Sequence, residues 1–327
     1  MEALINRYQK YGLSLCLGAG ISVQSGIPSW ETLLKRLCID ITDDPNLFEL
    51  LINNGADYLS LANYLVSKDT DWVTKLRNAI YQDFKYYKTN IAEGNKAQFV
   101  NYVEDSNASL SAIGDLLALK NEGQRTFRAN PNINSIFTLN FDCVLQSYCY
   151  AKFQKRILRT TERASASRME GRINIYHLHG MLRFDNRISL EKESSDKIIL
   201  TENEYFARFA NPYNVFNYTL LTHLRENSFL FIGLSMTDIN LRRLLYLSKN
   251  EIINAYRNEG ISAAKLKQKV QQNVNKHFAI LKSSGDKTVK KYYEESLKNL
   301  GVNILWIDDF NEITTILDTL KLATNKE

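Results

Sequence analysis

The chain has 327 residues, 44% of them hydrophobic and 24% charged, and its formal net charge is +5. This composition is typical of a globular protein with a large core, and so small a positive excess does not require nucleic acid as a direct ligand. No secretion signal and no run of eighteen apolar residues are visible, so we expect neither export nor a membrane span. Four cysteines without a paired motif favour the reducing cytoplasm.

The first predicted element is a strand over Leu13–Leu17, followed by a glycine-rich turn. Glycines let the backbone approach a pyrophosphate, and N–H groups at a helix start attract its negative charge. The turn is not the dehydrogenase fingerprint G-x-G-x-x-G, because Val23 stands where the third glycine belongs. The sequence predicts a dinucleotide site made here by Gly18, Ala19, Gly20, Ser22, Pro28 and Trp30.

A helix is predicted after this turn, with Ser29 as its N-cap and apolar residues at helical spacing as far as Ile41. From about residue 43 to residue 130, amphipathic helical segments follow one another with no convincing strand between them. We interpret this stretch as a helical insertion within a single domain covering residues 1–327.

Strand-like runs alternate with helical patterns in the remaining sequence, which predicts a Rossmann-like α/β fold with a mostly parallel sheet. Thr201 and Glu204 form a capping-box pattern that predicts a short helix as far as Phe209. A later helix is expected to stop at Gly301. The expected strands lie around Ile136, Ile157, Ile173 and Ile198, and over residues 229–232, 278–281 and 302–307.

Polar motifs follow three of these strands, and open α/β sheets bind ligands at the carboxyl ends of their strands. We therefore expect His179 to be functional and His177, two residues earlier, to serve packing. Asp238 has two open interpretations, as the N-cap of the next helix or as a ligand contact. The motif residues are Thr138, Asn140 and Asp142 after the first strand, His179 and Gly180 after the second, and Gly233, Ser235 and Asp238 after the third.

Together with residues 18–30, these motifs resemble those of the sirtuin (Sir2) family, in the order that the family requires. The resemblance implies a Sir2-type fold that binds NAD. It places Asn140 beside the nicotinamide ribose, His179 as the catalytic histidine, and Ser235 near the adenosine half. Thr138, Asp142, Gly233 and Asp238 are expected in the same NAD site.

The cysteines depart from the family. Protein-deacylating sirtuins carry a zinc ribbon of two C-x-x-C pairs, since tetrahedral zinc needs four closely spaced ligands. Here the four cysteines are scattered, and we expect them to be buried apolar residues with no zinc module and no metal site. Without the ribbon, turnover of NAD itself becomes the expected activity. The cysteines are Cys16, Cys38, Cys143 and Cys149.

Asn140 and His179 suit cleavage of the bond between nicotinamide and ribose. An amide can hold a ribose hydroxyl or the attacking water, and an imidazole can accept a proton. The resemblance thus implies an NAD glycohydrolase that depletes NAD in bacterial antiphage defence. Alternatives are an NAD-dependent deacylase or ADP-ribosyltransferase, and a non-catalytic subunit that senses NAD or ADP-ribose.

An unregulated NADase would harm its host, so we expect control by a homo-oligomer or by a regulatory protein partner encoded separately. A run of seven basic residues between residues 152 and 172 also holds Glu162 and Glu170. Such a run is usually a solvated face, and the alternative is a docking surface for nucleic acid or an acidic partner. No interleaved aromatic residues support direct reading of nucleic acid.

Overall fold

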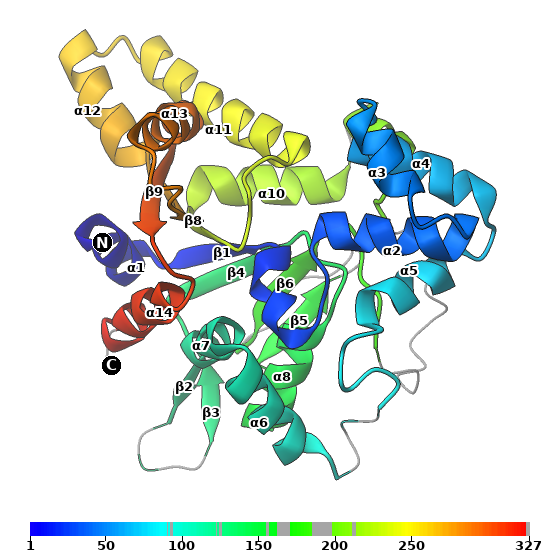
Figure 1. Cartoon of the computed structure of the whole chain (residues 1–327). Coiled ribbons are helices and arrows are strands. Elements are labelled where there is room, and N and C mark those ends of the chain that lie inside the picture. Colours follow the sequence, from blue (N-terminus) through cyan, green and yellow to red (C-terminus); the bar gives the residue numbers. More distant parts are fainter. Residues whose placement is uncertain are drawn as a thin grey trace.

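The computed structural model describes residues 1–89, 91, 94–121, 123, 126–154, 157–161, 171–184, 198–210 and 214–324. In these residues a seven-stranded parallel sheet has the order β5-β6-β4-β1-β7-β8-β9 (Figure 1). This confirms the predicted α/β fold. The strands are β1 (Leu13–Leu17), β4 (Ile133–Thr138), β5 (Leu158–Thr161), β6 (Ile173–His177), β7 (Ser228–Ile232), β8 (His277–Lys282) and β9 (Val302–Ile307).

Strand β1 lies in the middle of the sheet, with β4 on one side and β7 on the other. All five of its residues are buried, as expected of a strand covered on both faces. Leu17 is level with Thr138 of β4 and with Ile232 of β7. The loops after these three strands therefore start side by side, at the switch point where open α/β sheets bind ligands.

Two layers of helices cover the sheet (Figure 1). Leu13, Leu15 and Leu17 point into one core and Cys16 into the other, because successive side chains of a strand face opposite sides. The first core is closed by α1 (Glu2–Tyr11), α7 (Ala108–Leu117), α8 (Val144–Phe153) and α14 (Glu312–Leu322), and the second by α10 (Val215–Glu226), α11 (Ile239–Asn258) and α13 (Lys287–Lys298).

The expected helical insertion holds helices and one feature that the prediction missed. Strands β2 (Ala118–Lys120) and β3 (Phe127–Ala129) form a small antiparallel ladder. Three-residue strands are too short to show an alternating pattern, which explains the omission. The helices of this part of the chain, after α2 (Trp30–Thr42), are α3 (Leu47–Asn53), α4 (Tyr58–Lys68), α5 (Trp72–Tyr81), α6 (Lys96–Ser106) and α7.

The strand predicted around Ile198 is wrong. Residues 198–200 are buried but belong to no strand, and the Ile199 N–H donates to the carbonyl oxygen of His179 at 2.9 Å. Their apolar character reflects burial in a loop and not pairing in the sheet. The helix after them, α9 (Glu202–Ala210), begins as predicted: the Glu204 carboxylate accepts from the Thr201 N–H at 2.6 Å.

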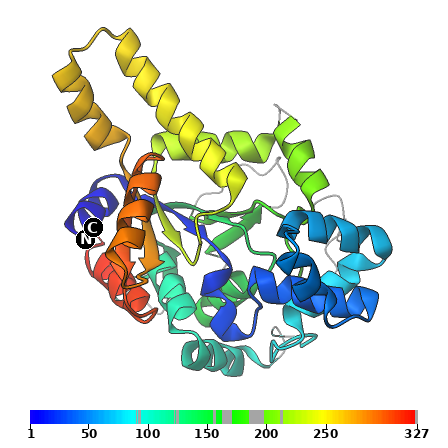
Figure 2. The same cartoon turned by 45° about the horizontal axis from the view of Figure 1, so that its top comes forward.

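Helix α11 continues into α12 (Ala263–Asn273), and the two form a hairpin that projects from the body of the molecule in both cartoon views (Figure 1, Figure 2). Short 3₁₀ turns, η1 (Ala19–Ile21) and η2 (Val23–Ser25), lead from β1 towards α2, where Ser29 caps the helix as predicted. In the part of the chain that the structure describes, no helix is long and apolar enough to cross a membrane.

Candidate functional site

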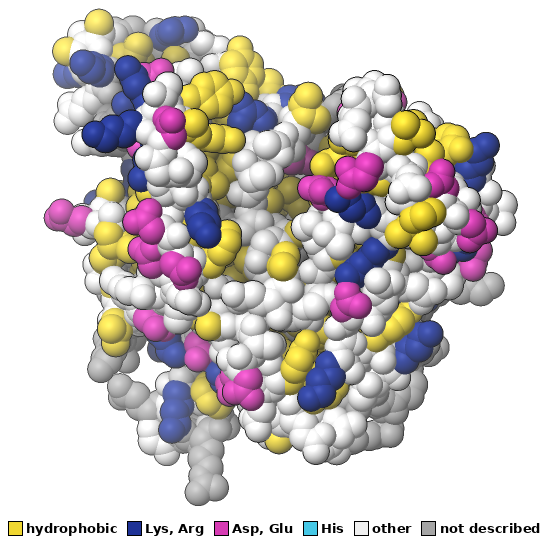
Figure 3. Space-filling model, viewed as in Figure 1, with side chains coloured by type: hydrophobic (Ala, Val, Ile, Leu, Met, Phe, Trp, Pro, Cys, Tyr) yellow, Lys and Arg dark blue, Asp and Glu magenta, His cyan; other side chains and the backbone are white. Residues whose placement is uncertain are grey.

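A cavity of about 620 Å³ opens at the carboxyl ends of the central strands, within the range of small-molecule sites. The space-filling view shows the surface hollowed between the α10–α11 side and the α2–α3 side (Figure 3). Most of the sequence-predicted residues line this cavity: Gly18, Ala19, Pro28, Trp30, Asn140, Asp142, His179, Gly233, Ser235 and Asp238.

The glycines let two loops of the cavity pack backbone against backbone. A Cβ on Gly18 would lie 2.5 Å from the Gly233 oxygen, and one on Gly20 would lie 2.9 Å from the Gly233 Cα. Gly233 has a φ of +68°, and the Gly20 N–H donates to its oxygen at 3.0 Å. The close approach expected between Gly20 and a ligand is thus made to the loop after β7, which holds the floor of the cavity in place.

Replacing Gly20 with valine is therefore expected to destabilise the fold by about 1–3 kcal/mol, the usual cost of overpacking. Denaturant unfolding measures this loss. Ala19→Val is the matched control, because it adds a branched side chain at the neighbouring position, which lines the cavity. An unfolding midpoint for Gly20→Val equal to that of the control would contradict the packing argument.

The Asn140 side chain is held by hydrogen bonds from its nitrogen, while its oxygen lacks a partner among the described residues. Its side-chain nitrogen donates to the Gly18 oxygen at 3.1 Å and to the Ser22 hydroxyl at 3.4 Å, which fixes the orientation of the amide. The Asn140 Oδ1 is buried and has no hydrogen-bond partner among the described residues. An unpartnered buried acceptor is costly, so this oxygen suits a ligand hydroxyl or a water molecule.

Two sequence-predicted hydroxyls lie behind Asn140 and do not line the cavity. The Thr138 hydroxyl accepts from the Asn140 N–H at 3.0 Å and donates to the Leu17 oxygen at 3.2 Å. Ser22 is 1% exposed and accepts from the Asn140 amide. In this arrangement both hydroxyls position Asn140.

Two further groups support the same corner. His177, expected to serve packing, is buried, and its Nδ1–H donates to the Asn140 backbone oxygen at 3.0 Å. The Asp142 Oδ1 accepts from the Val144 N–H at 3.0 Å, while Oδ2 has no partner among the described residues. Burial raises the pKa of Asp142, although the hydrogen bond from the Val144 N–H opposes that shift.

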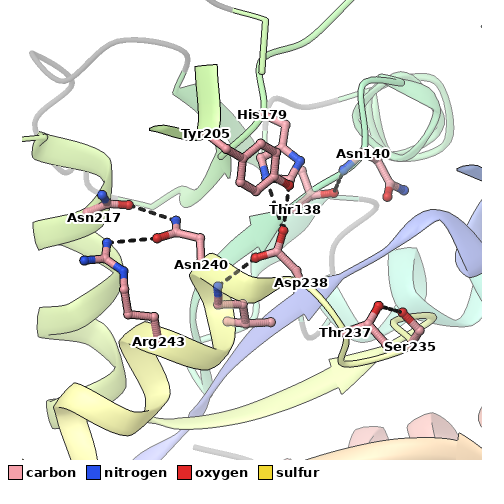
Figure 4. Close-up of polar contacts among 11 residues, drawn as sticks. Thr138, Asn140, His179, Tyr205, Asn217, Ser235, Thr237, Asp238, Asn240 and Arg243 are labelled. Atoms are coloured by element: carbon pink, nitrogen blue, oxygen red, sulfur yellow. Dashed lines mark hydrogen bonds and ion pairs between the residues drawn. The ribbon is translucent and has the colours of Figure 1, made fainter. Parts of the chain in front are cut away.

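His179 belongs to a network with Tyr205 and Asp238 (Figure 4). The Tyr205 hydroxyl donates to Asp238 Oδ2 at 2.7 Å and lies 3.2 Å from Nε2 of His179. Asp238 Oδ2 is 3.7 Å from the same nitrogen, and its Oδ1 caps α11 by accepting from the Leu241 N–H at 2.7 Å. The two interpretations of Asp238 are therefore compatible, since one carboxylate caps the helix and faces the cavity.

The network fixes how His179 carries its proton. Because the single hydroxyl proton of Tyr205 goes to Asp238, we assign the Nε2 proton of His179 to the Tyr205 oxygen, which leaves Nδ1 as the acceptor. Burial lowers the pKa of His179 to about 4, and Asp238 only partly offsets this. At neutral pH His179 is a neutral imidazole able to accept a proton.

Tyr205 is a cavity residue that the sequence analysis did not predict. The capping box at Thr201 fixes the start of α9, and Tyr205 lies one turn further on, so the helix start was a usable signal. Thr237 was also missed; it lines the cavity, and its hydroxyl lies 2.7 Å from that of Ser235. Apolar walls come from Leu139, Phe141, Tyr58, Met236 and Ile239, among others.

The four cysteines are free and buried, as expected. Within the described residues no group of three or more His, Cys, Asp or Glu side chains could hold a metal ion. Of the basic run, Lys152 pairs with Glu104 at 2.7 Å and with Asp115 at 2.6 Å, so it is tied into the protein. Lys155, Arg156, Arg163 and Arg168 lie outside the described residues.

A model of the SIR2-like domain matches residues 134–305, which is more than half of the chain. The chain belongs to the SIR2-like family. The matched segment of this SIR2-like protein holds Asn140, His179 and Asp238, and begins after the glycine turn at residues 18–30.

Three curated proteins named NAD(+) hydrolase ThsA are similar to this SIR2-like chain. The protein from Enterococcus faecium is 22% identical over 325 residues, covering 98% of this chain and 58% of its own length. The protein from Acinetobacter baumannii is 19% identical, and the match covers 98% of this chain and 55% of that protein. The protein from Bacillus cereus is 20% identical, and the match covers 93% of this chain and 52% of that protein. The chain thus spans little more than half the length of these relatives.

Proposed function

We propose that this SIR2-like protein is an NAD glycohydrolase, which converts NAD and water to nicotinamide and ADP-ribose. The observation that carries the proposal is the meeting of Asn140 and His179 in one cavity, where the amide offers an unpartnered oxygen and the imidazole is neutral. The names of the three relatives support NAD as the substrate.

In the proposed reaction, the bond from ribose C1′ to the nicotinamide nitrogen breaks, and its electron pair neutralises the pyridinium. No acid is needed for this departure. Asn140 Oδ1 accepts a hydrogen bond from a ribose hydroxyl or from the attacking water, and His179 Nδ1 takes the proton that the water loses. In this proposal Asp142 Oδ2, which has no partner among the described residues, accepts a hydrogen bond from the carboxamide of nicotinamide.

We further propose that the activity serves antiphage defence by depleting NAD. Its control then falls to a homo-oligomer or to a separately encoded protein partner, because unregulated depletion of NAD would harm the host cell. The network of His179, Tyr205 and Asp238 favours turnover over a pure sensor of NAD or ADP-ribose, because sensing alone requires no proton acceptor.

The deciding experiment incubates the purified protein with NAD, with and without an acetylated peptide, and measures nicotinamide, free ADP-ribose and deacetylated peptide. Equal release of nicotinamide and ADP-ribose without peptide supports the hydrolase. Nicotinamide release that depends on the peptide would identify a deacylase, and ADP-ribose bound to protein would identify a transferase. NAD binding without any product would favour the non-catalytic subunit that senses NAD or ADP-ribose.

Tyr205→Phe is expected to lower NAD turnover about tenfold, as loss of a positioning hydrogen bond does. Without the hydroxyl, Asp238 loses a donor and acts more strongly on His179, so the acid limb of the pH–rate profile should move to higher pH. Tyr218→Phe, at an exposed tyrosine of α10, is the control. An unchanged pH profile would show that Tyr205 does not act through His179.

A further inference from the structure

A second cavity, of about 410 Å³, lies at the amino ends of β7 and β8, at the opposite end of these strands from the first cavity. Its lining includes Ser228, the first residue of β7, and Lys276, which directly precedes β8. Helices α1, α10, α11 and α12 close it, on the side where α1 lies beside the base of the α11–α12 hairpin (Figure 1, Figure 2). This cavity plays no part in the proposed cleavage of NAD.

Positive charge dominates its lining. The lining contains three cationic side chains, those of Arg7, Arg225 and Lys276, and one carboxylate, that of Glu226. Glu251 pairs with Arg225 at 3.7 Å, but both side chains of that pair are about half exposed, so water weakens the attraction. Even with Glu251 included, the three cations of the lining outnumber these two carboxylates.

Lys276 is the most unusual member. It is 5% exposed, and its ammonium group donates to the Arg225 carbonyl oxygen, which leaves two N–H donors. Burial, Arg7 and Arg225 together lower its pKa to about 8, despite Glu226. The same charges, on Lys276 and Arg7, help to lower the pKa of the buried His277. A buried ammonium that shares its cavity with two guanidinium groups and one carboxylate would be stabilised in its charged form by a further negative charge.

We infer that this cavity binds a small phosphate-bearing ligand. Guanidinium groups match phosphate oxygens in pairs, and a phosphate can balance more than one of the three cations. The cavity also has room for more than the phosphate itself, and Tyr11 and Tyr256 stand at its wall. Free phosphates and nucleotide phosphates share this chemistry.

The test is calorimetric titration of the whole protein, in low salt and without phosphate buffer, with inorganic pyrophosphate and separately with AMP. Saturable binding of either probe is expected, and the tighter one identifies the source of the phosphate. Lys276→Met should weaken it roughly tenfold or more, as loss of a charge-assisted hydrogen bond does. Arg225→Gln, at an exposed position, is the second variant and should act in the same direction.

Lys249→Met is the matched control, since Lys249 also donates to a backbone oxygen, that of Lys298 at 3.1 Å, and is not part of the lining. Its affinity should equal that of the unmodified protein. Absence of saturable binding would overturn the inference. So would full affinity in both Lys276→Met and Arg225→Gln, because the probe would then bind outside this cavity. Neither readout requires NAD cleavage.

Discussion

Asn140→Ala is expected to lower NAD turnover roughly a hundredfold or more, as removal of a positioned catalytic group does. The substitution removes Oδ1, the unpartnered oxygen assigned to the ribose hydroxyl or the water. NAD affinity should change much less, since the rest of the cavity stays available to the pyrophosphate and the adenosine. Steady-state kinetics and direct NAD titration measure the two effects separately.

Asn303→Ala controls for the loss of an asparagine as such. The Asn303 amide also donates to backbone oxygens, those of Asn275 at 3.0 Å and His277 at 3.1 Å, but it lies on β9, away from the cavity. Both variants should lose similar stability, and Asn303→Ala should keep its turnover. Normal turnover in Asn140→Ala would remove this residue from the mechanism.

His179→Ala is expected to cause a loss of similar size, because no other described imidazole lines the cavity. The double variant with Asn140→Ala should be little worse than either single variant if the two residues act on one step. His223→Ala is the control, as His223 contacts Ser135 and Asn227 outside the cavity. Full turnover in both catalytic variants would favour the sensor over the hydrolase.

The pH profile of the unmodified protein offers a second check on His179. Its neutral form is the base, so turnover should be level near neutrality and fall as pH drops towards about 4. His177 shares a pKa lowered to about 4 by burial, well below that of an unfolded histidine. Protonation of both therefore favours unfolding as pH falls through this range, so circular dichroism must accompany the assay.

The fold was predictable where hydrophobic pattern and turn chemistry agree. Strand β1, the cap at Ser29, the capping box at Thr201 and the helix stop at Gly301 all rest on local signals. The run at Ile198 was mistaken for a strand because burial alone gives the same apolar pattern. The β2–β3 ladder is too short for any pattern to show.

The candidate site was predictable as a set of motifs and not as a geometry. Strand ends placed Asn140 and His179 at one edge, but only the structure shows that Ser22 and Thr138 stand behind Asn140. Nothing in the sequence ties Tyr205 to His179, since their contact depends on how α9 packs. Likewise, the sequence predicts that Gly20 contacts a ligand, whereas in the structure it packs against the loop of Gly233.

The pairing of β1 with β7 has a consequence for synthesis on the ribosome. Leu13 pairs with Ser228, so roughly two hundred residues, about ten seconds or more of translation, separate the two partners. Until then one edge of β1 is open, and the wall from Gly233 to Leu241 does not exist. A nascent chain therefore cannot assemble the complete cavity before most of its length has emerged. If the protein cleaves NAD as proposed, the nascent chain cannot do so before the segment from Gly233 to Leu241 has emerged from the ribosome.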